Sequence, residues 1–198
     1  MYLDEQELFD LRRSLETIRD IVRFLQKSDD DEEEGTSPYP CLKRLAGDIT
    51  VFPQLIAKIN GILSPYGKIK DNASTELARI RRELASTMGS ISRSLNSILR
   101  NAQSEGVVDK DVTPTMRDGR LVIPVAPALK RKIRGIVHDE SASGKTVFIE
   151  PAEVVEANNR IRELEGDERR EIIRILTGFS NQLRPSIPDA VSYTHLRA

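Results

Sequence analysis

Leucine, isoleucine and valine recur at alternating spacings of three and four residues over the first part of the chain. Between Asp4 and Lys27 these positions are Leu8, Leu11, Leu15, Ile18, Val22 and Leu25. This is the a/d pattern of a helix that packs against other helices along a narrow seam. It predicts a helix over residues 4–27, in which intervening polar side chains such as Arg12 and Arg13 face water or partner helices.

Two further long segments carry the same kind of pattern. The segment from Thr75 to Gln103 would form a helix about 40 Å long, with the seam Leu77, Ile80, Leu84, Met88, Ile91, Leu95 and Ile98. Pro151 is expected to open a last long helix, with the seam Val154 or Val155, Asn158, Ile161, Glu165, Ile172, Ile175, Phe179 and Leu183. Shorter helices are expected over residues 41–47 and 53–63. Aromatic residues make up only 5% of the chain, which suits long helices with hydrated faces better than a globule with a large core.

The pattern changes after Gly106. Residues 112–116 and 120–125 flank Asp118-Gly119, which is a strong signal for a two-residue hairpin turn. Residues 133–138 and 146–149 indicate two more strands, joined by a turn at 141–144. The predicted fold is therefore mainly α, with long antiparallel, coiled-coil-like helices and a small antiparallel β-hairpin insert. We expect a helical part over 1–111, the β insert over 112–150 and a long helix over 151–188.

An acidic run, Asp29–Glu34, is followed by Gly35 and Pro38. Repulsion between like charges and these helix breakers predict a surface loop over residues 28–40. The run lacks the ligand spacing of a calcium-binding loop, so we expect no metal there.

Cys41 is the only cysteine, which excludes an internal disulfide and favours a cytoplasmic protein. We expect no membrane association, because no apolar run approaches the ~20 residues of a membrane span.

Three motifs resemble catalytic sites without completing one. Gly144-Lys145-Thr146 lacks the glycine that a phosphate loop needs five positions earlier, where Asp139 stands. His138 and its neighbouring acidic and serine residues form no nucleophile elbow. Glu150 and Glu153 are interpreted as residues at the start of a helix. We therefore predict no catalytic residue, cofactor or metal in this chain.

One cluster of charge remains as a candidate site. This cluster, the basic patch, consists of Lys130, Arg131, Lys132 and Arg134. Such a patch can neutralise nucleic-acid phosphates, or it can simply be a solvated loop, and the sequence leaves both interpretations open. No aromatic residue lies between these cations to stack on a base.

Four stretches together resemble a known family. They are Ser74–Leu84 (STELARIRREL), Met116–Val125 (MRDGRLVIPV), Gly135–Gly144 (GIVHDESASG) and Phe148–Asn159 (FIEPAEVVEANN). These stretches are similar to the core and lever region of the second bacterial branch of the MutS family, whose members typically end in an Smr nuclease domain. The resemblance reaches to about Pro188. Residues 189–198 fit no helix pattern and nothing in the family, so we interpret them as a non-native tail.

The resemblance implies a function that the residues alone do not. Members of this branch are ATP-dependent dimers that bind branched DNA, restrain recombination or split stalled ribosomes. The chain would then be a non-catalytic lever fragment of an ATPase, with DNA or ribosomal RNA as partner. ATP and Mg²⁺, the homodimer contact and the endonuclease would belong to other parts of the protein. The alternative hypothesis is a structural coiled-coil adaptor whose heptads serve only protein assembly.

Overall fold

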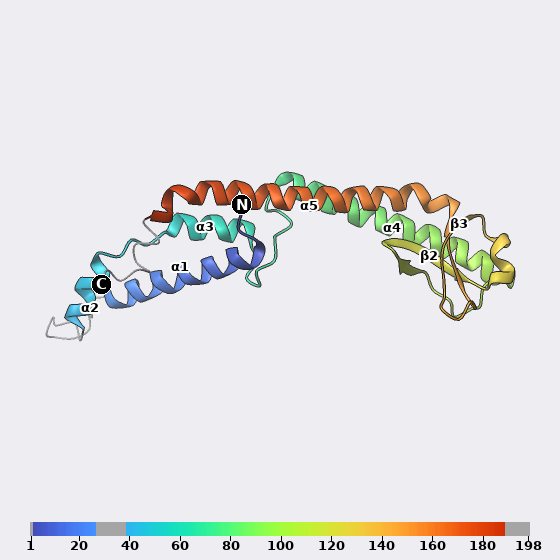
Figure 1. The fold of residues 1–198 in the computed structure, drawn as a ribbon, viewed down its shortest axis with the longest axis horizontal. Helices are drawn as coiled ribbons and strands as arrows, with labels where there is room; N and C mark the ends of the chain where they lie inside the picture. The colour runs from blue at the N-terminus through green and yellow to red at the C-terminus, as the bar shows by residue number, and fades with distance from the viewer. Residues whose placement is uncertain (1, 27–38, 189–198) are drawn as a thin grey trace. The chain divides into compact units, whose positions relative to one another are not determined.

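The computed structural model describes residues 2–26 and 39–188, where the chain is mainly helical with one small antiparallel sheet, as predicted (Figure 1). The helices are α1 (Glu5–Gln26), α2 (Pro40–Gly47), α3 (Pro53–Ile62), α4 (Thr75–Ser104) and α5 (Val155–Leu183). The strands are β1 (Thr115–Arg117), β2 (Arg120–Val125), β3 (Gly135–Glu140) and β4 (Val147–Pro151), with short 3₁₀ segments η1 (Pro127–Lys132), η2 (Ala152–Val154) and η3 (Arg184–Ser186). Most of the predicted acidic loop and the predicted tail lie outside the described residues.

The chain divides into two compact units. One comprises Met1–Thr75 with Glu171–Ala198, and the other comprises Glu76–Arg170. The basic patch and the whole sheet belong to the second unit.

In the first unit, α1 buries one position of each heptad. Leu8, Leu15 and Val22 are each at most 6% exposed, and α1 contacts α2 and α3. Arg12, which was expected to face water or a partner helix, is only 5% exposed. Its guanidinium donates to the carbonyl oxygens of Ser64 at 2.9 Å and Pro65 at 3.1 Å. These carbonyls belong to the turn that follows α3, so the buried cation joins α1 to that turn.

In the second unit, α4 and the first half of α5 lie side by side (Figure 1). Arg81 Nε donates to Glu168 at 2.7 Å, and Arg160 Nη2 donates to Glu83 at 2.7 Å. Residue numbers rise along α4 as they fall along α5, so the two helices are antiparallel, as predicted.

Both seams depart in part from the predicted positions. In α4 the predicted Met88 is exposed, and Leu99 is buried whereas the predicted Ile98 is only partly buried. The shift to a later residue is geometric, because an α-helix has 3.6 residues per turn and a strict heptad assumes 3.5. In α5 Leu164 is fully buried in place of the predicted Glu165, which is exposed, as the apolar and the charged side chain require.

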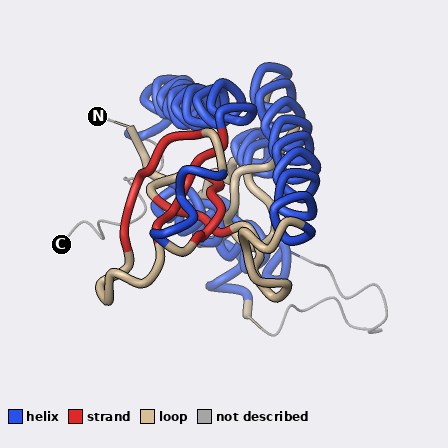
Figure 2. Tube along the Cα trace, turned by 90° about the vertical axis from the view of Figure 1, so that its right-hand side faces the viewer, coloured by secondary structure: helices blue, strands red, loops and turns tan. Residues whose placement is uncertain are grey.

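The four strands form one sheet in the order β1-β2-β4-β3, and all neighbours are antiparallel (Figure 2). Asp118 and Gly119 have φ values of 47° and 73°, as a type I′ hairpin turn requires, so the hairpin prediction is confirmed. Ile123, Val125 and Ile149 share a hydrophobic core with residues of α4. The sheet thus packs on the last turns of that helix.

Pro151 ends β4 and does not open α5, so this expectation is wrong. It pairs with Gly135 of β3, η2 follows, and α5 begins only at Val155. The fixed φ of proline suits the end of a strand as well as the first turn of a helix. Pro151 has φ −60° and ψ 143°, which is extended backbone.

Candidate nucleic-acid interface

The basic patch lies on one connecting segment between β2 and β3. Lys130, Arg131 and Lys132 occupy the end of η1, and Arg134 immediately precedes β3. All four residues are exposed. Within residues 2–26 and 39–188, none of these side chains has an ion-pair or hydrogen-bond partner. The structure therefore brings the predicted residues together and leaves their charges available to an anion.

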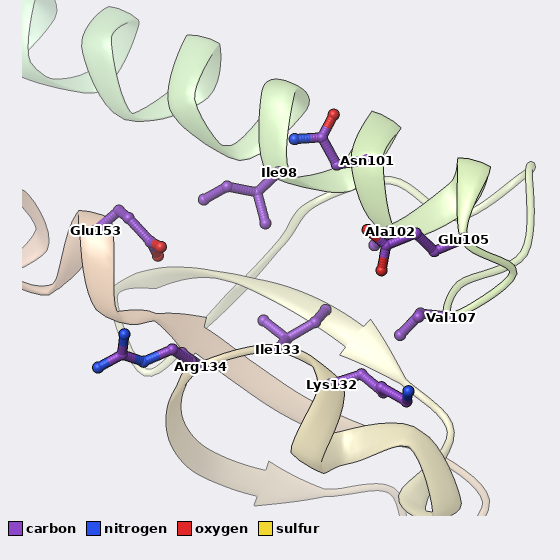
Figure 3. A pocket seen from close by; sticks show the side chains of 9 residues that line it. All are labelled: Ile98, Asn101, Ala102, Glu105, Val107, Lys132, Ile133, Arg134 and Glu153. Carbon is purple, nitrogen blue, oxygen red and sulfur yellow. The ribbon is translucent and has the colours of Figure 1, made fainter.

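Two members of the patch, Lys132 and Arg134, flank a pocket of about 270 Å³ (Figure 3). The opposite wall is formed by Ile98, Asn101 and Ala102, whose i, i+3 and i+4 spacing places them on one face of α4, and by Glu105 immediately after that helix. The lining residues are Ile98, Asn101, Ala102, Glu105, Val107, Lys132, Ile133, Arg134 and Glu153.

A glycine turn ends α4 at this pocket. Gly106 has φ 69°, and its N–H donates to the Gln103 carbonyl at 3.2 Å. The N–H of Val107 donates to the Ala102 carbonyl at 2.8 Å. Because Gly106 adopts left-handed backbone without strain, the chain turns back and Val107 joins the lining of the pocket.

The pocket has an apolar interior and a charged rim. Ala102, Val107 and Ile133 are each at most 9% exposed. Figure 3 shows Arg134 and Glu153 at one end and Lys132 and Glu105 at the other. In the described part of the chain, no ion pair joins these acids to these bases. The two carboxylates reduce the attraction of the patch for phosphates, since like charges repel across a short distance.

A buried polar cluster that was not predicted from the sequence links the sheet to α5. Glu150, at the fourth position of β4, is 0% exposed. Its carboxylate accepts hydrogen bonds from Arg120 at 2.7 Å and Asn158 at 2.8 Å, and it lies 2.5 Å from Nε2 of His138. The cluster joins β2, β3, β4 and α5. The interpretation of Glu150 as a helix-start residue is therefore wrong.

A β-bulge aims His138 at this carboxylate. Val137 pairs with Ile149 and Asp139 pairs with Phe148, so His138 is the extra residue of β3. Bulges re-aim side chains in this way. Burial alone would raise the pKa of Glu150, but the hydrogen bonds from His138, Asn158 and Arg120 and the charge of Arg120 hold this pKa below its ordinary value. The cluster holds the three strands and α5 together through its charged hydrogen bonds. None of its groups lines the pocket.

The other motifs occupy structural positions. Gly144-Lys145-Thr146 lies at the β3–β4 turn and leads into a strand, whereas a phosphate loop leads into a helix. Within the described residues, no group of three or more His, Cys, Asp or Glu side chains has the arrangement of a metal site. No helix in the same part of the chain is long and apolar enough to span a membrane.

The chain is similar to several bacterial proteins named Endonuclease MutS2. It is 39% identical over 182 residues to the protein of Finegoldia magna and 39% identical over 178 residues to that of Pelotomaculum thermopropionicum, which correspond to 92% and 90% of this chain. The protein of Lacticaseibacillus paracasei is 39% identical over 183 residues. The chain spans about a fifth of the length of these relatives, 22% in each case. No protein-family model matches it. The similarity supports a MutS-type origin, in agreement with the predicted resemblance.

Proposed function

We propose that this chain is a non-catalytic lever segment of an ATP-dependent MutS-type protein that handles DNA or stalled ribosomes. The observation that carries the proposal is the 39% identity to Endonuclease MutS2 proteins over nine-tenths of the chain. The antiparallel pairing of α4 and α5 supports it, because two long helices held by cross-helix ion pairs can transmit a displacement along their length.

In this proposal the reactions of the whole protein reside elsewhere. ATP and Mg²⁺ binding, the nuclease and the homodimer contact belong to the four-fifths of the relatives' length that the chain does not span. The protein would act in the cytoplasm. This segment would contribute mechanical coupling and a contact with nucleic acid.

The basic patch is the proposed contact. Four exposed cations within five residues can reach neighbouring phosphates of one backbone. Such contacts position a protein without reading sequence, so we expect weak and sequence-independent binding to DNA or to ribosomal RNA.

A salt titration tests this contact. Each neutralised phosphate on duplex DNA contributes about 0.9 to the slope of log affinity against log salt, so four contacts give at most about −3.6. Replacing Lys130, Arg131, Lys132 and Arg134 by alanine should bring the slope close to zero. Alanine at the exposed Arg23, Arg93, Arg162 and Arg169 is a control that removes the same charge. An equal loss of slope in both variants would contradict the proposal.

The adaptor hypothesis remains the alternative and has its own discriminating observation. The observation is the protein sequence that the gene encodes after Leu183. A predicted strand followed there by Gly-x-x-x-x-Gly-Lys-Ser/Thr would support the MutS-type protein. Continued heptads with no ATPase would support the adaptor.

A further inference from the structure

We propose that the pocket between α4 and the η1–β3 link binds one unpaired nucleobase, while Lys132 and Arg134 hold the phosphates on either side of it. The inference rests on the proposed function, because it assigns the pocket to the same nucleic-acid surface. It adds a ligand class, namely a nucleotide that is not base-paired.

The size of the pocket and its apolar interior suit a single flat ring system. Its volume of about 270 Å³ lies just below the range of about 300–1,000 Å³ that is typical of drug-sized ligands. Ile98 and Ile133 face each other across it (Figure 3). A base inserted between these two side chains would bury both of its faces, as bases do in the pockets of proteins that extrude them.

The rim supplies groups that match the edge of a base. Asn101 offers an amide that both donates and accepts, and Glu105 offers a carboxylate that accepts from an amino or ring N–H. Both side chains are exposed. Because neither is used in an ion pair in the described part of the chain, both are available to a ligand.

The two cations stand at opposite ends of the pocket (Figure 3). A nucleotide whose base enters the pocket leaves a phosphate on each side of the opening. Lys132 and Arg134 are placed to neutralise one each, and Lys130 and Arg131 extend the charge along the same segment. This arrangement distinguishes a base within a chain from an isolated apolar ligand.

The affinity of the chain for a nucleic acid should therefore depend on whether the nucleic acid contains an unpaired base. Extruding a paired base costs a few kcal/mol, whereas a bulged or single-stranded base is extruded at little cost. The patch alone would bind paired and bulged duplexes equally, and the pocket would favour the bulged one.

The test compares three labelled duplexes of one sequence, prepared as DNA and as RNA. One is fully paired, one carries a single bulged 2-aminopurine, and one carries an abasic bulge. We expect the 198-residue chain to bind the 2-aminopurine bulge about tenfold more tightly than the other two, with a change in 2-aminopurine emission. The DNA and RNA arms identify the source of the nucleotide.

A pocket-filling variant, Asn101→Leu, provides the second arm, because leucine fills space without offering an aromatic ring on which a base can stack. Position 101 is exposed on α4, and Asn96→Leu on an exposed, non-lining position of the same helix is the matched control. Asn101→Leu should abolish the preference for the bulge over the paired duplex, and Asn96→Leu should leave that preference unchanged. Equal wild-type affinity for all three duplexes would overturn the pocket inference and leave the patch intact. The absence of binding to any duplex would overturn both.

Discussion

Glu150 is a fully buried charged residue at the centre of a polar cluster in the second unit. A fully buried carboxylate is tolerated only when its charge is compensated, and here Arg120, Asn158 and His138 surround it. Arg120 is itself largely buried, with a side chain 15% exposed. Removing one charge of such a pair leaves the other buried and uncompensated.

We therefore expect Glu150→Gln to lower the free energy of unfolding by about 3 kcal/mol. Glutamine keeps the shape of the side chain, removes its charge and replaces one acceptor oxygen by an amide donor. The measurement is chemical denaturation at pH 7 followed by circular dichroism. Glu153→Gln, at an exposed position three residues later, is the control and should change stability little. A Glu150→Gln variant as stable as the wild type would contradict the role of the cluster.

The same carboxylate predicts a pH dependence. Its pKa is lower in the folded protein than the ordinary value. Its contribution to stability is therefore fully present above the unfolded pKa, about 4.3, and is lost as the pH falls through the lower folded pKa. The stability difference between the wild type and Glu150→Gln should therefore shrink as the pH falls below about 4.3. A difference that grows on acidification below about pH 4.3 would show that the sign is wrong.

Gly135 is the residue that lets β3 approach β4. A Cβ atom at this position would lie 2.1 Å from the Glu150 carbonyl oxygen, which is far inside van der Waals contact. We expect Gly135→Ala to destabilise the protein by about 1–3 kcal/mol, because the strands must separate. Gly89→Ala in α4 meets no atom within 4 Å and should stabilise by about 0.5–1 kcal/mol. Thermal melts of both variants check the pair, and shifts of the same sign would contradict this interpretation.

At the scale of elements, the periodic seams and the hairpin turn could be predicted, because each depends on neighbouring residues. The helices begin and end within a few residues of the predicted limits. The Glu150 cluster could not be predicted, since a bulge, two strand pairings and a contact from α5 bring its members together. A sequence signal existed nevertheless: Glu150 follows the apolar run Val147–Ile149 and precedes Pro151, so it stands inside a strand that is buried throughout.

The candidate site was predictable in part. The four cations are adjacent in sequence, and the structure leaves all of them exposed. The pocket was not predictable, because α4 and the η1–β3 link are about thirty residues apart in the chain. The carboxylates of Glu105 and Glu153 were likewise not expected to stand beside Lys132 and Arg134.

These carboxylates give a prediction at the element scale. Neutralising Glu105, which follows α4, and Glu153 of η2 should tighten binding of a fully paired duplex, because these acids oppose the attraction of the patch. We expect the double variant Glu105→Gln, Glu153→Gln to bind about threefold to tenfold more tightly at low salt, measured by fluorescence anisotropy. The double variant Glu156→Gln, Glu165→Gln, at two exposed positions outside the pocket, is the control, because it makes the same change in net charge. Unchanged affinity in the double variant would place the contact elsewhere.

At the scale of the whole molecule, the proposed mechanical role and the proposed recognition role belong to different elements. α4 and the first half of α5 form the antiparallel helical part of the second unit, and the sheet that packs on the end of α4 carries the patch and one wall of the pocket. The net charge of the chain is only −1, so a contact with nucleic acid must come from local charge and not from the overall balance. A lever with a nucleic-acid contact at one end is what the proposed MutS-type function requires.

Hydrogen exchange of the full chain, measured with and without a saturating bulged duplex, tests whether the patch and the pocket are the nucleic-acid interface. We predict that bound nucleic acid slows amide exchange in Pro127–Glu140 and in the last turns of α4, with little change in α1 and α3. If binding saturates while exchange in Pro127–Glu140 is unchanged and protection appears in another segment, the patch is not the nucleic-acid interface.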